Sequence, residues 1–106
     1  MELQNLSTEE IELCYRADPF EMTRSILKED LRGLEIISIK GIEKRNLLPK
    51  EVVNVLLIYF YQEFAGQVYN RTDLIKLYNS WASNNVNTFN EAVQMAKEDI
   101  RQHLGR

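Results

Sequence analysis

The sequence has very few of the residues that build reactive or metal-binding sites. Its 106 residues include one cysteine (Cys14), one histidine (His103), four scattered glycines and two prolines. A single cysteine excludes a disulfide framework within the chain and a zinc site built from several cysteines. The glycines form no phosphate-binding loop, and Cys14 on an apolar helix face is typical of a core residue. We therefore expect no enzyme activity, no metal ion and no cofactor.

The sequence also lacks a long hydrophobic stretch. The longest uninterrupted apolar run, residues 55–61, has seven residues, whereas a membrane-spanning helix needs about 20. The first ten residues are polar and acidic, without the basic and apolar regions of a signal peptide. A single free thiol is typical of the reducing cytosol. We expect a cytoplasmic protein without a membrane span.

No overall excess of positive charge is present, because the formal net charge is -3. The charges are nevertheless uneven: residues 1–35 carry nine acidic and four basic side chains, and residues 36–106 carry seven acidic and nine basic ones. The basic residues are densest at Lys40, Lys44, Arg45 and Lys50. Any anion-binding surface is therefore expected in the later two-thirds of the chain.

The length and a hydrophobic content of 44% indicate one domain with one core. Ser7 and Glu10 form a capping-box pattern that predicts a helix over residues 8–16. The Asp18-Pro19 pair predicts the start of a second helix, with Gly33 as its end. Residues 34–38 are interpreted as a buried connector, after which Ser38 caps a short helix through about residue 47.

The most hydrophobic segment, residues 52–64, is predicted to be a central helix. Pro49 at its start and Gly66 past its end favour a helix over a strand. A helix that is apolar nearly all round is packed on several sides. Asn54 in its middle then needs a hydrogen-bond partner.

Two further helices are predicted in the last third of the chain. Asn70 is expected to cap a helix with an apolar stripe, and this stripe consists of Leu74, Leu77, Tyr78 and Trp81. Thr88 and Glu91 form another capping-box pattern, which starts a helix to about residue 104. The predicted fold is all-α, a compact single domain of five or six short helices around a central hydrophobic helix.

The group of basic residues can be interpreted in two ways. On a helix over residues 39–47, Lys40 and Lys44 share one face, Arg45 lies close by and Lys50 follows Pro49. Such a patch can contact phosphates without reading sequence, or it is a solvated helix face. Trp81, on the same predicted helix as Lys76, either stacks on an unpaired base or packs on the central helix.

Two stretches carry a family resemblance over about residues 20–100. Residues 47–59 read LLPKEVVNVLLIY, and residues 77–92 contain LYNSW followed by VNTFNEA. In this order and spacing they resemble the helical domain of the DnaD-like and DnaB-like primosomal proteins. These form the replication initiation and membrane attachment family of low-GC Gram-positive bacteria and phages. The family's Tyr-xxx-Ile-xxx-Trp motif maps onto Asp73, Leu77 and Trp81, so an acidic residue replaces the tyrosine.

The resemblance implies a non-enzymatic module of a longer primosomal protein that assists loading of the replicative helicase. Its expected partners are DNA, in particular single-stranded DNA, and the helicase, loader and initiator proteins, or copies of itself. Attachment at the membrane would come from other parts of such a protein. The predicted DNA-binding residues are Lys40, Lys44, Arg45, Lys50, Lys76 and Trp81.

The alternative is a protein-interaction module that does not bind DNA. The acidic first third of the chain favours this alternative, with exposed apolar residues of the first helix, such as Leu13, docking a partner helix.

Overall fold

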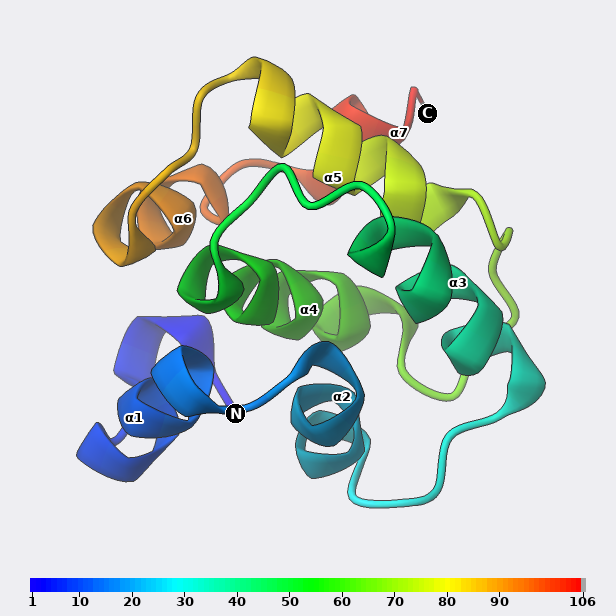
Figure 1. The fold of residues 1–106 in the computed structure, drawn as a ribbon, viewed down its shortest axis with the longest axis horizontal. Helices are drawn as coiled ribbons and strands as arrows, with labels where there is room; N and C mark the ends of the chain where they lie inside the picture. Colours follow the sequence, from blue (N-terminus) through cyan, green and yellow to red (C-terminus); the bar gives the residue numbers. More distant parts are fainter. Residues whose placement is uncertain (106) are drawn as a thin grey trace.

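The computed structural model describes residues 1–105, and within them every regular element is a helix. The elements are η1 (Leu3–Asn5), α1 (Thr8–Arg16), α2 (Pro19–Leu27), α3 (Gly33–Glu43), α4 (Lys50–Phe64), α5 (Asp73–Ser83), α6 (Phe89–Met95) and α7 (Ile100–Leu104) (Figure 1). The all-α class is confirmed. The described part of the chain has seven α-helices, against the five or six expected.

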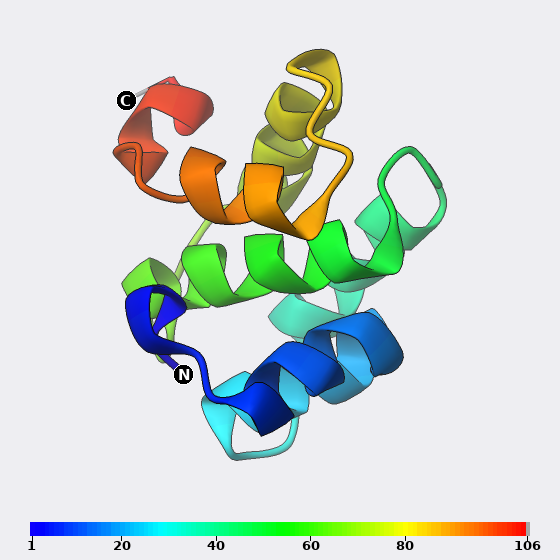
Figure 2. The ribbon, with the colours of Figure 1, turned by 90° about the vertical axis from the view of Figure 1, so that its left-hand side faces the viewer.

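Helix α4 is the centre of the fold. Every side chain in residues 52–61 is buried, so the helix contacts protein on all sides, as its sequence predicts. Figure 2 shows α1 and α2 beneath α4, with α5, α6 and α7 above it. Helix α3 packs against α2 and α5 and so joins the lower and upper groups. Among residues 1–105, no helix has the combined length and apolar character to cross a bilayer.

The hydrogen-bond partners expected for Asn54 lie at the junction between α1 and α2. Asn54 is fully buried, and its Nδ2 donates to the carbonyl oxygens of Cys14 at 2.7 Å and Ala17 at 2.8 Å. These carbonyls lie where α1 ends, so one amide satisfies two backbone acceptors that the helix leaves free. The hydrogen-bonding requirement of Asn54 thereby fixes the first two helices to the central one.

Side-chain caps start several helices where the sequence predicts. Ser7 accepts from the Glu10 backbone N–H at 3.1 Å, and the Glu10 carboxylate accepts from the Ser7 N–H at 2.9 Å. Asp18 caps α2 and Thr88 caps α6 by accepting from the N–H of Glu21 and Glu91, but neither has the return bond of a full capping box. The predicted helix over residues 8–16 is confirmed at both ends.

The start of α3 differs from the prediction. Gly33 is the first residue of α3 and does not end α2. Helix α2 ends at Leu27, because Lys28 adopts the left-handed conformation with φ 58°. A lysine there gives no sequence signal, since this position usually holds glycine or asparagine.

The predicted connector over residues 34–38 is also wrong, because these residues lie inside α3. The buried face of this helix is formed by Glu35, Ser38, Ile39 and Ile42. Two polar residues on that face interrupt the apolar stripe that would have marked a helix. Ser38 does not cap a helix; its Oγ donates to the carbonyl oxygen of Leu34 at 2.8 Å.

The predicted last helix is divided in two. Helix α6 ends at Met95, and Asp99 caps α7 by accepting from the Arg101 backbone N–H at 3.0 Å. The hydroxyl of Tyr59 on α4 donates to the carbonyl of Glu98 within the break. The break turns α7 onto α5, where it packs.

Candidate functional site

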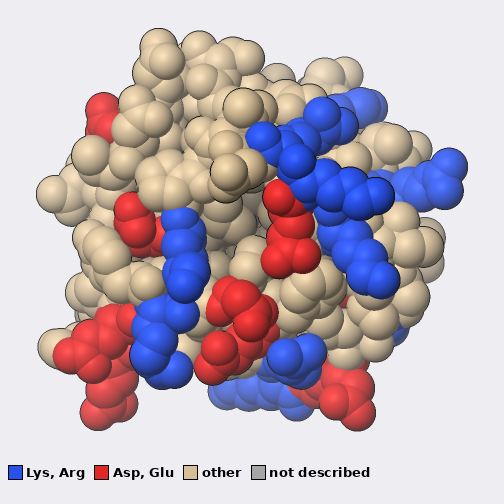
Figure 3. Space-filling view, in the orientation of Figure 1, with Lys and Arg blue, Asp and Glu red and all other residues tan. Residues whose placement is uncertain are grey.

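Helices α3 and α5 pack side by side, and a group of exposed cations lies on them and on the segments next to them. We define the α3–α5 basic surface by these residues: Lys40, Lys44, Arg45, Arg71 and Lys76. Figure 3 shows Lys and Arg side chains gathered over this part of the molecule. Among residues 1–105, none of the five forms an ion pair. Their charges are therefore available to an external anion.

The turn between α3 and α4 carries Lys44 and Arg45 and is held by α5. The buried hydroxyl of Tyr78 accepts hydrogen bonds from the backbone N–H groups of Leu47 at 2.7 Å and Leu48 at 3.1 Å. Asn46 in the same turn is left-handed, with φ 48°, a conformation that asparagine tolerates better than most residues. The hydrogen bonds to Tyr78 and the conformation of Asn46 fix the turn from which the Lys44 and Arg45 side chains project.

Lys50 lies apart from the other predicted cations. Its Nζ donates to the carbonyl oxygen of Arg16 at 3.4 Å, at the end of α1. It borders a hollow whose lining includes the acidic Glu43 and buried apolar residues of α3 and α4. Of the predicted cluster, Lys40, Lys44, Arg45 and Lys76 therefore belong to the α3–α5 basic surface, whereas Lys50 faces the α1–α2 junction.

The structure corrects the prediction that Trp81 contacts DNA. Trp81 is fully buried, and its ring stacks on Tyr59 of α4 with a centroid separation of 5.8 Å. It belongs to the apolar stripe of α5, which turns toward the core. The alternative interpretation, packing on the central helix, is confirmed.

Asp73, the acidic residue in the stretch that resembles the family motif, is also buried. Its Oδ2 accepts from the backbone N–H of Asn70 at 3.2 Å, while Asn70 Oδ1 accepts from the Thr72 N–H at 2.9 Å. A carboxylate in the first turn of α5 is stabilised by the helix dipole. The predicted cap of the helix by Asn70 is wrong: α5 begins at Asp73 with Thr72 as its N-cap and no side-chain cap, and Asn70 holds the turn before the helix.

A buried polar network that the sequence did not predict joins α3, α4 and the loop before α5. Glu35 is 1% exposed and accepts from Arg32 Nε and Nη2, each at 2.8 Å. It also accepts from the Tyr69 hydroxyl at 2.8 Å, and the Tyr61 hydroxyl lies 2.8 Å from that of Tyr69. Arg32 Nη2 donates further to the carbonyl oxygen of Gln67 at 3.1 Å. In the sequence, the Arg-x-x-Glu spacing of Arg32 and Glu35 could have indicated the ion pair in this network.

Electrostatics within this network favour an ionised Glu35. Burial by itself raises the carboxyl pKa, but hydrogen bonds from Arg32 and Tyr69 outweigh it and hold the pKa of Glu35 below its usual value. Burial raises the pKa of Tyr61 to about 12, so this hydroxyl stays protonated. The network holds the loop over residues 65–72 against the start of α3.

A second polar contact chain connects α7 to α5. His103 Nδ1 lies 2.7 Å from Ser80 Oγ, and His103 Nε2 lies 3.2 Å from Glu98 Oε2. Ser80 lies within α5, where the helix uses the neighbouring backbone N–H groups in its own hydrogen bonds. A nucleophilic serine needs such N–H groups to stabilise an oxyanion. We therefore interpret these contacts as an anchor for the short α7.

The buried Cys14 thiol supports a further prediction. Burial raises the pKa of Cys14 to about 11, and the charge of Glu10 acts in the same direction. We expect the native protein to react with a thiol-specific disulfide reagent at least a hundredfold more slowly than a small thiol at neutral pH, because thiolate is the reactive form. Absorbance of the released chromophore gives the rate, and addition of denaturant should restore rapid reaction. A fast native rate would contradict the burial.

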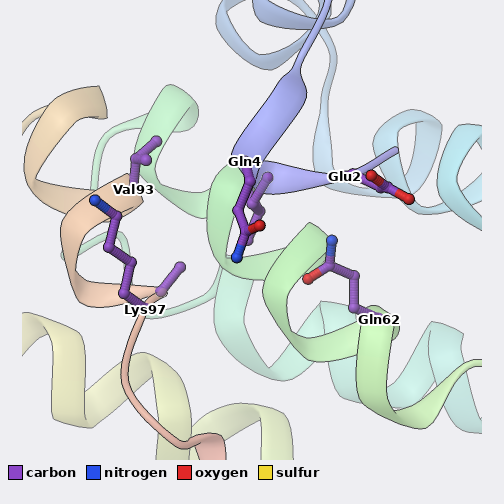
Figure 4. A pocket seen from close by; sticks show the side chains of 7 residues that line it. Glu2, Gln4, Gln62, Val93 and Lys97 are labelled. Atoms are coloured by element: carbon purple, nitrogen blue, oxygen red, sulfur yellow. The ribbon is translucent and has the colours of Figure 1, made fainter.

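Four hollows outside the α3–α5 basic surface hold one cation at most, and one of them is lined by the acidic Glu63, Glu98 and Asp99. One of about 410 Å³ lies among η1, α4 and α6 and is lined by Glu2, Gln4, Gln62 and Lys97 together with apolar side chains (Figure 4). Its polar groups are exposed and of mixed sign. Within residues 1–105, no group of three His, Cys, Asp or Glu side chains is placed to hold a metal ion. The α3–α5 basic surface is therefore the candidate functional site.

The chain was compared with models of known protein families, with curated proteins and with solved structures, and it matches none of them.

Proposed function

We propose that this domain binds the phosphate backbone of DNA through the α3–α5 basic surface, as a module of a primosomal replication-initiation protein. The observation that carries the DNA-binding proposal is the set of five exposed cations on α3, α5 and the segments next to them, none of which forms an ion pair within residues 1–105. The sequence resemblance to the DnaD-like domain supports the primosomal role and the assembly with helicase, loader and initiator proteins.

Lysine and arginine at these positions suit contact with phosphates. Phosphate contacts supply affinity and orientation but no base recognition. Each contact releases condensed counterions, so the affinity falls as salt rises, by about 0.7 in log–log slope per contact for a single strand. We expect binding to single-stranded DNA that is independent of sequence and strongly salt-dependent.

Neutralising Lys44 and Arg45 tests the proposal. The double variant Lys44→Gln, Arg45→Gln should bind a labelled single-stranded oligonucleotide roughly tenfold more weakly near 0.1 M salt, with a slope smaller by about 1.4. Fluorescence anisotropy between roughly 50 and 200 mM salt measures both quantities. Both residues are exposed, so the fold should be unaffected.

A matched control removes cations outside this surface. Lys50→Gln and Lys97→Gln each delete one exposed positive charge, and neither residue belongs to the α3–α5 basic surface. They should leave the salt slope unchanged. Equal losses of DNA affinity in the control and test variants would overturn the assignment of the surface. Wild-type protein that fails to bind DNA would overturn the proposed function itself.

A protein-interaction role is the second candidate, and exposed apolar residues near the basic surface favour it. Ile37 on α3 is 53% exposed and Leu47 in the following turn is 58% exposed. The earlier expectation of docking through Leu13 is not supported, because Leu13 is half-buried against the core. We therefore propose α3 and its following turn for the interaction role, and Tyr15, which is 53% exposed on α1, keeps the first helix as an alternative.

A further inference from the structure

We infer that a hollow between α3 and α5 binds an acidic peptide segment that inserts one bulky apolar side chain. The Gly41 hollow is lined by Gly41, Lys44, Arg45, Leu47 and Ile75. It combines an apolar floor with a cationic rim. Such a hollow suits a partner that has both an apolar side chain and negative charge. The phosphate backbone of DNA has the negative charge but no apolar side chain.

Glycine shapes the floor of the hollow. A Cβ at position 41 would lie 2.8 Å from Ile75 Cδ1, which is closer than real Cβ contacts. Only glycine lets α3 and α5 approach this closely without displacement of Ile75. The half-buried Ile75 side chain is therefore present as an apolar surface beside Gly41.

Two exposed apolar side chains extend this surface. Leu47 lines the hollow, and Ile37 lies four residues before Gly41, on the same face of α3. Exposed leucine and isoleucine add nothing to phosphate binding, which needs positive charge and hydrogen-bond donors. A side chain such as phenylalanine or leucine would bury apolar area against Leu47 and Ile75, and that burial supplies a favourable free energy.

The charge on the rim defines the rest of the partner. Lys44 and Arg45 line the hollow, and Lys40 lies four residues before Lys44 on α3. Among residues 1–105, none of these cations is neutralised by an ion pair. Asp or Glu residues on both sides of the apolar side chain would complement them, whereas a basic peptide would be repelled.

The test uses a fluorescein-labelled peptide of sequence Asp-Asp-Asp-Phe-Asp-Asp and the same peptide with serine in place of phenylalanine. Anisotropy should show that wild-type protein binds the phenylalanine peptide at least fivefold more tightly than the serine peptide. The variant Leu47→Ser should lose this difference. Val68→Ser, which changes a residue that is 91% exposed outside the hollow, should keep it.

Binding of the two ligands is separated by titrating the same variants with single-stranded DNA. Leu47→Ser should weaken peptide binding about tenfold and leave the DNA affinity within twofold, whereas Lys44→Gln with Arg45→Gln should weaken both. Equal affinity for the two peptides, or an undiminished preference in Leu47→Ser, would overturn the inference. Wild-type protein that binds the peptide but not DNA would overturn the proposed function and leave the hollow assigned.

Discussion

Replacing Trp81 by alanine should destabilise the domain by about 3–5 kcal/mol. Trp81 is fully buried and stacks on Tyr59 of the central helix. Its removal leaves a cavity between α4 and α5 that the surrounding helices fill only in part. Urea unfolding followed by circular dichroism measures the change in the free energy of unfolding.

Trp81→Phe provides the matched control, because it keeps an aromatic ring against Tyr59. It should cost less than half as much as the alanine variant and retain the native DNA affinity. Trp81 is the one tryptophan of the chain, so its fluorescence reports on this site alone. Its emission should be unchanged by DNA, and quenching by DNA would contradict the buried position.

Replacing Glu35 by alanine should destabilise the domain by about 2–4 kcal/mol. The change removes the acceptor for two hydrogen bonds from the Arg32 side chain and one from the Tyr69 hydroxyl. It leaves the linked hydroxyls of Tyr61 and Tyr69 buried with fewer partners. The same urea experiment measures the loss.

Acid pH should reproduce part of this effect in the unchanged protein. The pKa of Glu35 is lowered on folding, so its ionised form stabilises the native state above the unfolded-state pKa. This contribution is lost as the pH falls through the folded-state pKa. Glu35→Gln should show a smaller loss of stability between neutral and acid pH than the wild type. Glu43→Ala, an exposed change on the same helix, should change stability by less than about 0.5 kcal/mol.

The elements that could be predicted are those whose signals lie within a few residues of each other. The caps at Ser7, Asp18 and Thr88 and the uninterrupted apolar run of α4 define helices without tertiary information. Helix α3 could not be found in this way. Its buried face holds Glu35 and Ser38, and Glu35 is accommodated there by its neighbour Arg32 together with Tyr69, which lies on a distant segment.

The same distinction applies to the candidate site. The charges of Lys40, Lys44 and Arg45 are adjacent in sequence and could be grouped from it. The proximity of α5, the separation of Lys50 and the burial of Trp81 depend on how α3, α4 and α5 pack. The Gly41 hollow depends on the packing of Ile75 of α5 over Gly41, which no local pattern encodes.

The Tyr78 hydroxyl has a consequence for the thermodynamics of binding. A free turn would lose conformational entropy when a ligand fixed it, at about 1–2 kcal/mol for each backbone residue. The bonds from Leu47 and Leu48 to Tyr78 order the turn before any ligand arrives. The turn is thus preorganised, and more of the contact energy of Lys44 and Arg45 appears as affinity. The strength of binding on this surface therefore depends in part on a hydroxyl that is buried beneath it.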